Sequence, residues 1–105
     1  MPRFAFKLRI KPHAGEEYDK AHSRVWPELL QRIKQHGISD YSIFRRGQDL
    51  VLVFRAEEFE KCWGAVQQDP LHQKWVKEME KYFEPVPDLQ PGEKLAMMKE
   101  IFYLE

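Results

Sequence analysis

Residues 50–54, Leu-Val-Leu-Val-Phe, are apolar at every position, and this run restricts the possible folds more than any other feature of the chain. Successive side chains of a strand point to opposite faces of the sheet. A strand that is apolar on both faces must therefore be covered on both faces. We expect a strand over 50–56, covered by helices on one face and by a second subunit on the other.

Three further strands are predicted, over residues 3–11, 38–44 and 97–104. In the first of them apolar side chains alternate with basic ones, which is typical of a half-buried strand, and Pro12 ends it. Residues 45–49 form a short hairpin connection between the second strand and the run at 50–56. Residues 85–92 contain three prolines and a glycine, so we expect a long connecting loop there.

The segments between these strands have helical periodicity. Apolar residues recur at steps of three and four over 16–36, and Gly37 is the expected C-terminal stop. Pro27 lies inside this pattern and should kink or restart the helix, because it has no N–H. A second helical segment covers 57–68, and Asp69-Pro70 is a typical start for another helix. Its apolar stripe consists of Leu71, Trp75, Met79 and Phe83.

The predicted order of elements is therefore strand, helix, two strands, helix, strand. This order is typical of a ferredoxin-like α+β fold, in which helices cover one face of an antiparallel sheet. The length of 105 residues and the absence of repeats predict a single domain over 1–105.

Composition excludes several classes of protein. Lys plus Arg equals Asp plus Glu, 17 against 17, so the net charge is zero, which argues against a nucleic-acid-binding surface and an electrostatically bound membrane protein. Cys62 is the only cysteine, so no intrachain disulfide can form and a reducing compartment is favoured. We find no signal-peptide core and no membrane-length apolar run, and therefore expect a cytoplasmic protein.

Sequence motifs for the commonest chemistries are missing. The four histidines and the lone cysteine have no spacing that matches a metal site. There is also no glycine-rich phosphate loop and no G-x-S-x-G serine motif. The search for a site therefore rests on the aromatic residues and the histidines.

Tyr18 and His22 are four residues apart and should share one helix face. A histidine there can be a satisfied core residue, or a general acid or base beside a tyrosine hydroxyl. Trp63 and Trp75 lie on successive helices, where they can be core residues or the flat walls of a pocket for an amphipathic ligand. Tyr41 fits a half-buried strand position. The pair Arg45-Arg46 fits a solvated turn.

Several segments resemble the L-rhamnose mutarotase family. Residues 16–29 resemble its E-E-Y-x-x-x-H-x-x-[IV]-W-P-E-L signature, and residues 36–43 resemble its H-G-x-x-x-Y-x-I segment. Trp63 with Val66 is similar to its W-x-x-[VA] helix, and residues 73–75 are similar to its Q-[RK]-W segment. Residues 100–104 resemble its E-V-F-Y-L ending. The resemblance covers almost the whole chain.

The resemblance implies a dimeric α/β barrel, made of two ferredoxin-like sheets packed face to face. It also implies an enzyme that interconverts the α and β anomers of L-rhamnose or a related deoxyhexose, without metal or cofactor. His22 would be the proton donor, and the expected substrate-binding residues are Tyr18, Tyr41, Trp75 and, at the pocket wall, Trp63. Val76 stands where the family pattern has a second tryptophan, so we expect this position to affect which sugar is preferred.

Mutarotation requires protonation of the ring oxygen and deprotonation of the anomeric hydroxyl. By this reading His22 supplies the first proton, and Tyr18 or a water helps at the hydroxyl. Two alternatives remain open because one fold can host many functions. The chain could be a cofactor-free monooxygenase of the same barrel architecture, or a module that binds a small ligand without turning it over.

Overall fold

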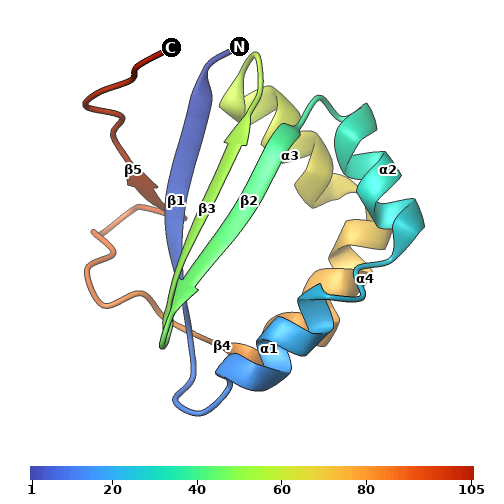
Figure 1. Cartoon of the computed structure of the whole chain (residues 1–105), viewed down its shortest axis with the longest axis vertical. Coiled ribbons are helices and arrows are strands. Elements are labelled where there is room, and N and C mark those ends of the chain that lie inside the picture. The colour runs from blue at the N-terminus through green and yellow to red at the C-terminus, as the bar shows by residue number, and fades with distance from the viewer.

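The strands of the computed structural model, which describes residues 1–105, form one antiparallel sheet in the spatial order β2-β3-β1-β4. The strands are β1 Arg3–Ile10, β2 Ser39–Arg46, β3 Asp49–Arg55, β4 Phe83–Glu84 and β5 Ala96–Met98. All of the helices lie on one side of this sheet (Figure 1). The strand order and the one-sided helix layer confirm the predicted ferredoxin-like α+β fold.

The last strand of the predicted order is interrupted in the structure. β4 pairs with β1 at Arg9 and Ile10, and β5 pairs with β1 further along, from Ala5 to Lys7. The loop between β4 and β5 contains the predicted loop at 85–92. The prediction of a strand over 97–104 is wrong beyond Met98. Met98 pairs with Ala5, and the two strands run antiparallel, so the residues after Met98 approach the start of β1. β1 begins at Arg3, and it therefore offers few further residues for pairing.

The helices are α1 Gly15–His22, α2 Pro27–Gln35, α3 Phe59–Gln68 and α4 Pro70–Met79. The predicted helix over 16–36 is therefore two helices, and Pro27 restarts the chain as the first residue of α2. Trp26, just before it, has φ −58° and ψ 125°, close to the polyproline II conformation that a residue preceding proline prefers. The prediction that the stripe of α4 continues to Phe83 is wrong, because α4 ends at Met79 and Phe83 begins β4. None of the helices has the length and the apolar character needed to cross a bilayer.

Gly37 ends α2 as predicted, and its backbone explains why a glycine is needed. Its φ is 95°, in the left-handed region that other residues avoid. The N–H of Gly37 donates to the carbonyl of Lys34, and the N–H of Ile38 donates to that of Ile33. These two bonds form a Schellman motif, which satisfies carbonyls at the helix end and turns the chain into β2.

Asp69 joins α2 to α4. Its carboxylate caps α4 by accepting the N–H of Leu71 at 2.9 Å, and it also accepts hydrogen bonds from Arg32 at 3.0 Å and His36 at 2.8 Å. The hydrogen bond from His36, with smaller contributions from Leu71 and Arg32, holds the pKa of Asp69 well below its usual range. This charged cap fixes the position of two helices that line the cavity described below.

β3 explains how the core is built. Leu50, Leu52 and Phe54 are buried against the helices, whereas Val51 and Val53 on the opposite face are only half-buried. Phe54 is stacked on Trp63 of α3, with ring centroids 5.1 Å apart. The helices therefore cover one face of β3, as predicted. The expected second subunit on the other face remains a prediction.

Candidate active site

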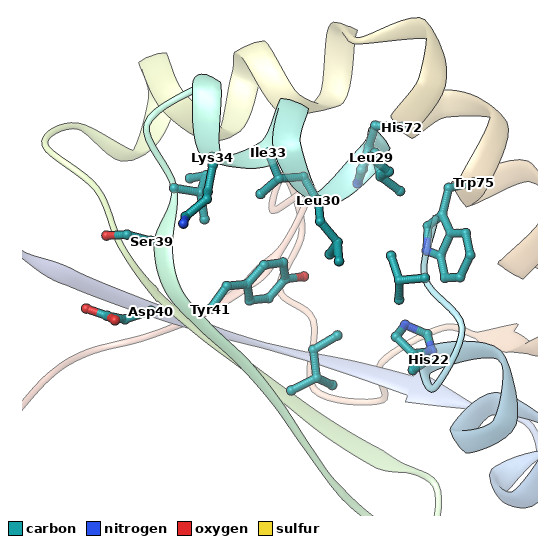
Figure 2. A pocket seen from close by; sticks show the side chains of 13 residues that line it. His22, Leu29, Leu30, Ile33, Lys34, Ser39, Asp40, Tyr41, His72 and Trp75 are labelled. Atoms are coloured by element: carbon teal, nitrogen blue, oxygen red, sulfur yellow. The ribbon is translucent and has the colours of Figure 1, made fainter. Parts of the chain in front are cut away.

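A cavity lies between the inner face of the sheet and the helices. It consists of two adjoining lobes of about 460 and about 360 Å³. Figure 2 shows the first lobe, with Tyr41 extending from β2 into the space between the helices, and His22 and Trp75 on the opposite side. The residues that line both lobes are His22, Tyr41, Ile43, His72 and Trp75. Cavities of this size and mixed apolar and polar lining suit a small ligand.

The structure brings all the predicted site residues to this one cavity. His22, Tyr41 and Trp75 line both lobes, and the second lobe is also lined by Tyr18, Trp63 and Val76. These residues come from four different elements, namely α1, β2, α3 and α4. The roles assigned to them by the resemblance remain predictions.

His22 is held by its own helix. Its Nδ1 lies 3.0 Å from the backbone oxygen of Tyr18, one turn earlier. A carbonyl oxygen only accepts hydrogen bonds, so Nδ1 must carry a proton and donate it. The other ring nitrogen, Nε2, makes no hydrogen bond within the protein and is left to interact with a ligand. The ring is also packed by Tyr18 at 4.1 Å and by Trp75, edge-on, at 5.5 Å between centroids.

The surroundings of His22 favour its neutral form. Burial lowers its pKa below the ordinary value of 6.5, and the hydrogen bond to Tyr18 and the charge of Asp19 oppose this effect only partly. Near pH 7 the imidazole is therefore neutral, and its Nε2 carries a lone pair. Such a group accepts a proton first and gives one afterwards.

In contrast to neutral His22, which can accept a proton, the phenols of Tyr18 and Tyr41 retain their own protons. Burial raises the pKa of both phenols, with a further contribution from Asp19 for Tyr18 and from Tyr18 for Tyr41. Both side chains stay protonated at neutral pH, so each phenol can donate a hydrogen bond. Whether Tyr18 or a water helps His22 at the anomeric hydroxyl remains a prediction.

Arg45 and Arg46 are both exposed, as predicted, but they belong to β2 and not to the turn, which is formed by Gly47 and Gln48. The guanidinium of Arg45 binds both carboxylate oxygens of Asp19 in α1, with Nε–Oδ1 at 2.7 Å and Nη2–Oδ2 at 2.6 Å. Asp19 lies directly after Tyr18 in α1. This bidentate pair therefore ties the helix that carries Tyr18 and His22 to the end of the sheet.

His72 is a cavity residue that sequence reasoning missed. It lies one helical turn before Trp75 in α4 and lines both lobes. Its ring is edge-on to Trp63, with centroids 5.7 Å apart. The three-residue spacing from Trp75 was the signal that could have identified it, because residues at this spacing share a helix face.

No three His, Cys, Asp or Glu side chains come together as a metal-binding group. Val76 lies at the edge of the second lobe and is 44% exposed. The chemistry that the cavity offers is therefore a histidine with a free Nε2, two phenol donors and the faces of aromatic rings. This set is suited to proton transfer on a polyhydroxy ligand.

Comparisons with known proteins agree with this description. Residues 3–104 match the family model described as L-rhamnose mutarotase. The chain is 40% identical to an L-rhamnose mutarotase from Cronobacter sakazakii, with all of both chains covered. It is also similar to the solved structure of an L-rhamnose mutarotase from Formosa agariphila, with 27% identity, all of both chains covered and a TM-score of 0.79.

A fourth similarity concerns the fold alone. Tetracenomycin F2 cyclase from Streptomyces glaucescens has a TM-score of 0.73 at 18% identity, over 100% of this chain and 98% of its own. One backbone architecture thus carries unrelated chemistry, and the family assignment depends on the sequence matches. Those matches extend over nearly the full length of the chain, and this protein belongs to the L-rhamnose mutarotase family.

Proposed function

We propose that this protein is a mutarotase that interconverts the α and β anomers of L-rhamnose or a related deoxyhexose. The observation that carries the proposal is the state of His22, which is neutral, fixed through Nδ1 and free at Nε2 in a cavity of sugar-compatible size. The family membership supports the same reaction class. No redox step or group transfer is required, because the two anomers are isomers.

The walls of the cavity suit a pyranose ring. A sugar has apolar C–H faces and polar edges, and it binds where aromatic faces alternate with hydrogen-bonding groups. Trp75 and Tyr41 face this space in Figure 2, and the Tyr41 hydroxyl points into it. We therefore assign sugar contacts to Tyr18, Tyr41, Trp75 and Trp63, and place Val76 at the rim.

The proton steps follow from the chemistry of His22. Neutral Nε2 accepts the proton of the anomeric hydroxyl while the bond between C1 and the ring oxygen breaks and C1 becomes an aldehyde. The imidazolium then gives its proton to the ring oxygen, which fits the proton-donor role implied by the resemblance. Rotation about the C1–C2 bond and the reverse steps close the ring with the other configuration. The donors Tyr18 and Tyr41 hold sugar oxygens throughout.

The proposal is tested by NMR saturation transfer between the two anomeric protons of L-rhamnose, with and without the protein. We expect faster exchange with the protein present, and repeating the experiment with L-fucose and other hexoses identifies the preferred sugar. A folded protein that accelerates exchange of none of these sugars would contradict the proposal. Binding without exchange would favour the ligand-binding module, and oxygen uptake with aromatic compounds would favour the monooxygenase.

We also propose that the enzyme is a homodimer in which two sheets pack face to face. The outer face of the sheet carries Phe44, whose side chain is 63% exposed. The C-terminal segment lies over the same sheet, because Glu100 pairs with Arg3 at 3.2 Å and the ring of Tyr103 lies 4.4 Å from the Arg3 guanidinium. The remaining apolar side chains of this segment are among the most exposed in the chain, namely Ile101, Phe102 and Leu104. A second copy would cover this apolar surface.

We place the enzyme in the cytoplasm. Its single cysteine, Cys62, is buried and cannot form an intrachain disulfide, which suits a reducing compartment. Separating cytoplasmic from periplasmic fractions of a bacterium that produces the protein would test this placement.

A further inference from the structure

The indole nitrogen of Trp63 is the one buried side-chain nitrogen or oxygen in the structure that has no hydrogen-bond partner. The residue is only 6% exposed, and its ring lines the second lobe of the cavity. Indole N–H is a donor only, and leaving such a donor unpaired in the interior is costly. Such a group usually has a partner outside the protein, and for a residue that lines a cavity a bound ligand can supply the missing acceptor.

His72 packs against the Trp63 ring and also lacks a hydrogen-bond partner. Its ring is edge-on to Trp63, and it makes no hydrogen bond with the protein, in contrast to His22 and His36. The ring nitrogens of His72 are therefore left to interact with a ligand in the second lobe. Burial lowers the pKa of His72, so the neutral ring offers one donor and one acceptor.

The two side chains can together bind a single hydroxyl. Their rings are in edge-on contact, with centroids 5.7 Å apart, and both residues line the second lobe. One ligand hydroxyl at this part of the wall can accept from the N–H of Trp63 and donate to the neutral ring of His72. A methyl group or a carbonyl oxygen cannot do both, so the pair is selective for a hydroxyl.

We propose that Trp63 and His72 form a hydroxyl-binding subsite on the helical side of the cavity, which determines which sugars the enzyme accepts. The proposal rests on the proposed function and deepens it. During mutarotation C1 turns about the C1–C2 bond, so the remainder of the sugar has to be held still. The subsite holds one ring hydroxyl, at C2, C3 or C4, while His22 acts at C1.

The test compares kcat/KM for anomer exchange of L-rhamnose with that of its 2-, 3- and 4-deoxy analogues. We expect the wild-type enzyme to prefer L-rhamnose over one of these analogues by about tenfold to a hundredfold, since that analogue leaves two polar groups unpaired. Trp63→Phe keeps an aromatic ring and removes the N–H. It should abolish most of the preference over that analogue and leave the other two ratios unchanged.

His72 provides a second, independent variant on a half-buried side chain. His72→Leu should weaken the preference over the same analogue, and His72→Gln, which can still donate and accept, should restore part of it. Trp26→Phe is the matched control for Trp63→Phe, because it also removes an indole N–H but lies outside the cavity lining. We expect it to leave all three ratios unchanged. Thermal melting of each variant identifies any that fails to fold.

Two results would overturn the subsite while leaving the proposed function intact. One is an equal loss of rate with all four sugars in folded Trp63→Phe, which would indicate a purely structural role. The other is an effect of the His72 variants on a different analogue.

If the wild-type enzyme exchanges no sugar, the proposed function fails, and calorimetric binding of the same four sugars then tests the subsite. Lack of binding, or equal binding of all four, would reject it.

Discussion

The lowered pKa of His22 predicts how the rate of anomer exchange depends on pH. Burial lowers the pKa of His22 from its ordinary value of 6.5, and the neutral form is the one that accepts the anomeric proton. The protein-dependent exchange rate should therefore reach a plateau at neutral and higher pH and fall in acid, with its midpoint below pH 6.5. Saturation transfer over a pH series, corrected for exchange without protein, measures this profile. A rate that rises as the pH falls would show that the protonated form starts the reaction.

A second prediction concerns the side chain of Val76 and the choice of sugar. It lies at the rim of the second lobe, where the family pattern has a tryptophan. Val76→Trp should fill part of this lobe and favour L-rhamnose over a sugar with a larger C5 substituent, such as L-mannose. Pocket changes of this size alter preference about tenfold. The ratio of kcat/KM for the two sugars tests it, with Val76→Ile as a control that retains an aliphatic side chain. An unchanged ratio in Val76→Trp would remove this position from sugar selection.

Residue placement could be predicted from sequence where spacing along one helix decides it. Tyr18 and His22 are such a pair, because residues four apart share a face. The pairing of Arg45 with Asp19 and the missing partner of Trp63 could not be predicted in this way. Both depend on how separate elements approach each other, which local periodicity does not describe.

The end of α2 provides a prediction at the scale of elements. Gly37 has a φ of 95°, and an added Cβ would lie 3.0 Å from the sulfur of Cys62. Gly37→Ala should therefore lower the free energy of unfolding by about 1–2 kcal/mol. Gly64 is the matched control, because it lies inside α3 and an added Cβ meets nothing within 4 Å. Gly64→Ala should raise the free energy of unfolding by about 0.5–1 kcal/mol.

Urea denaturation of both glycine variants measures these two changes. Equal destabilisation by both substitutions would contradict the account, because it would mean that the left-handed backbone at Gly37 is not what requires glycine there.

Elements were predictable from sequence where a local rule marks their ends. Pro27 and Gly37 are such markers, and both act in the structure as expected. The C-terminal strand was not predictable in detail. Residues 101–104 are all apolar, as in a buried strand, but whether this segment pairs depends on how much of β1 remains free. That is a property of the assembled sheet.

At the scale of the whole molecule, the outer face of the sheet leads to a prediction about the oligomeric state. Phe44 pairs across the sheet with Val51, and the two side chains share the face that the helices do not cover. If two copies pack through this face, Phe44→Asp should convert the dimer to a monomer, because it buries an unpaired charge. Light scattering during size-exclusion chromatography gives the mass directly. Phe44→Leu, which keeps an apolar side chain, should remain dimeric, and a dimeric Phe44→Asp would contradict this interface.

The central claim is that the protein exchanges sugar anomers through His22. The most direct test compares the wild-type enzyme with His22→Gln by saturation transfer with L-rhamnose at equal protein concentration. The account predicts that the protein-dependent exchange rate falls about 10²–10⁴-fold in His22→Gln, while circular dichroism shows an unchanged fold. His13→Gln, which alters an exposed histidine outside the cavity, should keep the wild-type rate. Equal rates for folded His22→Gln and the wild-type enzyme would contradict the account.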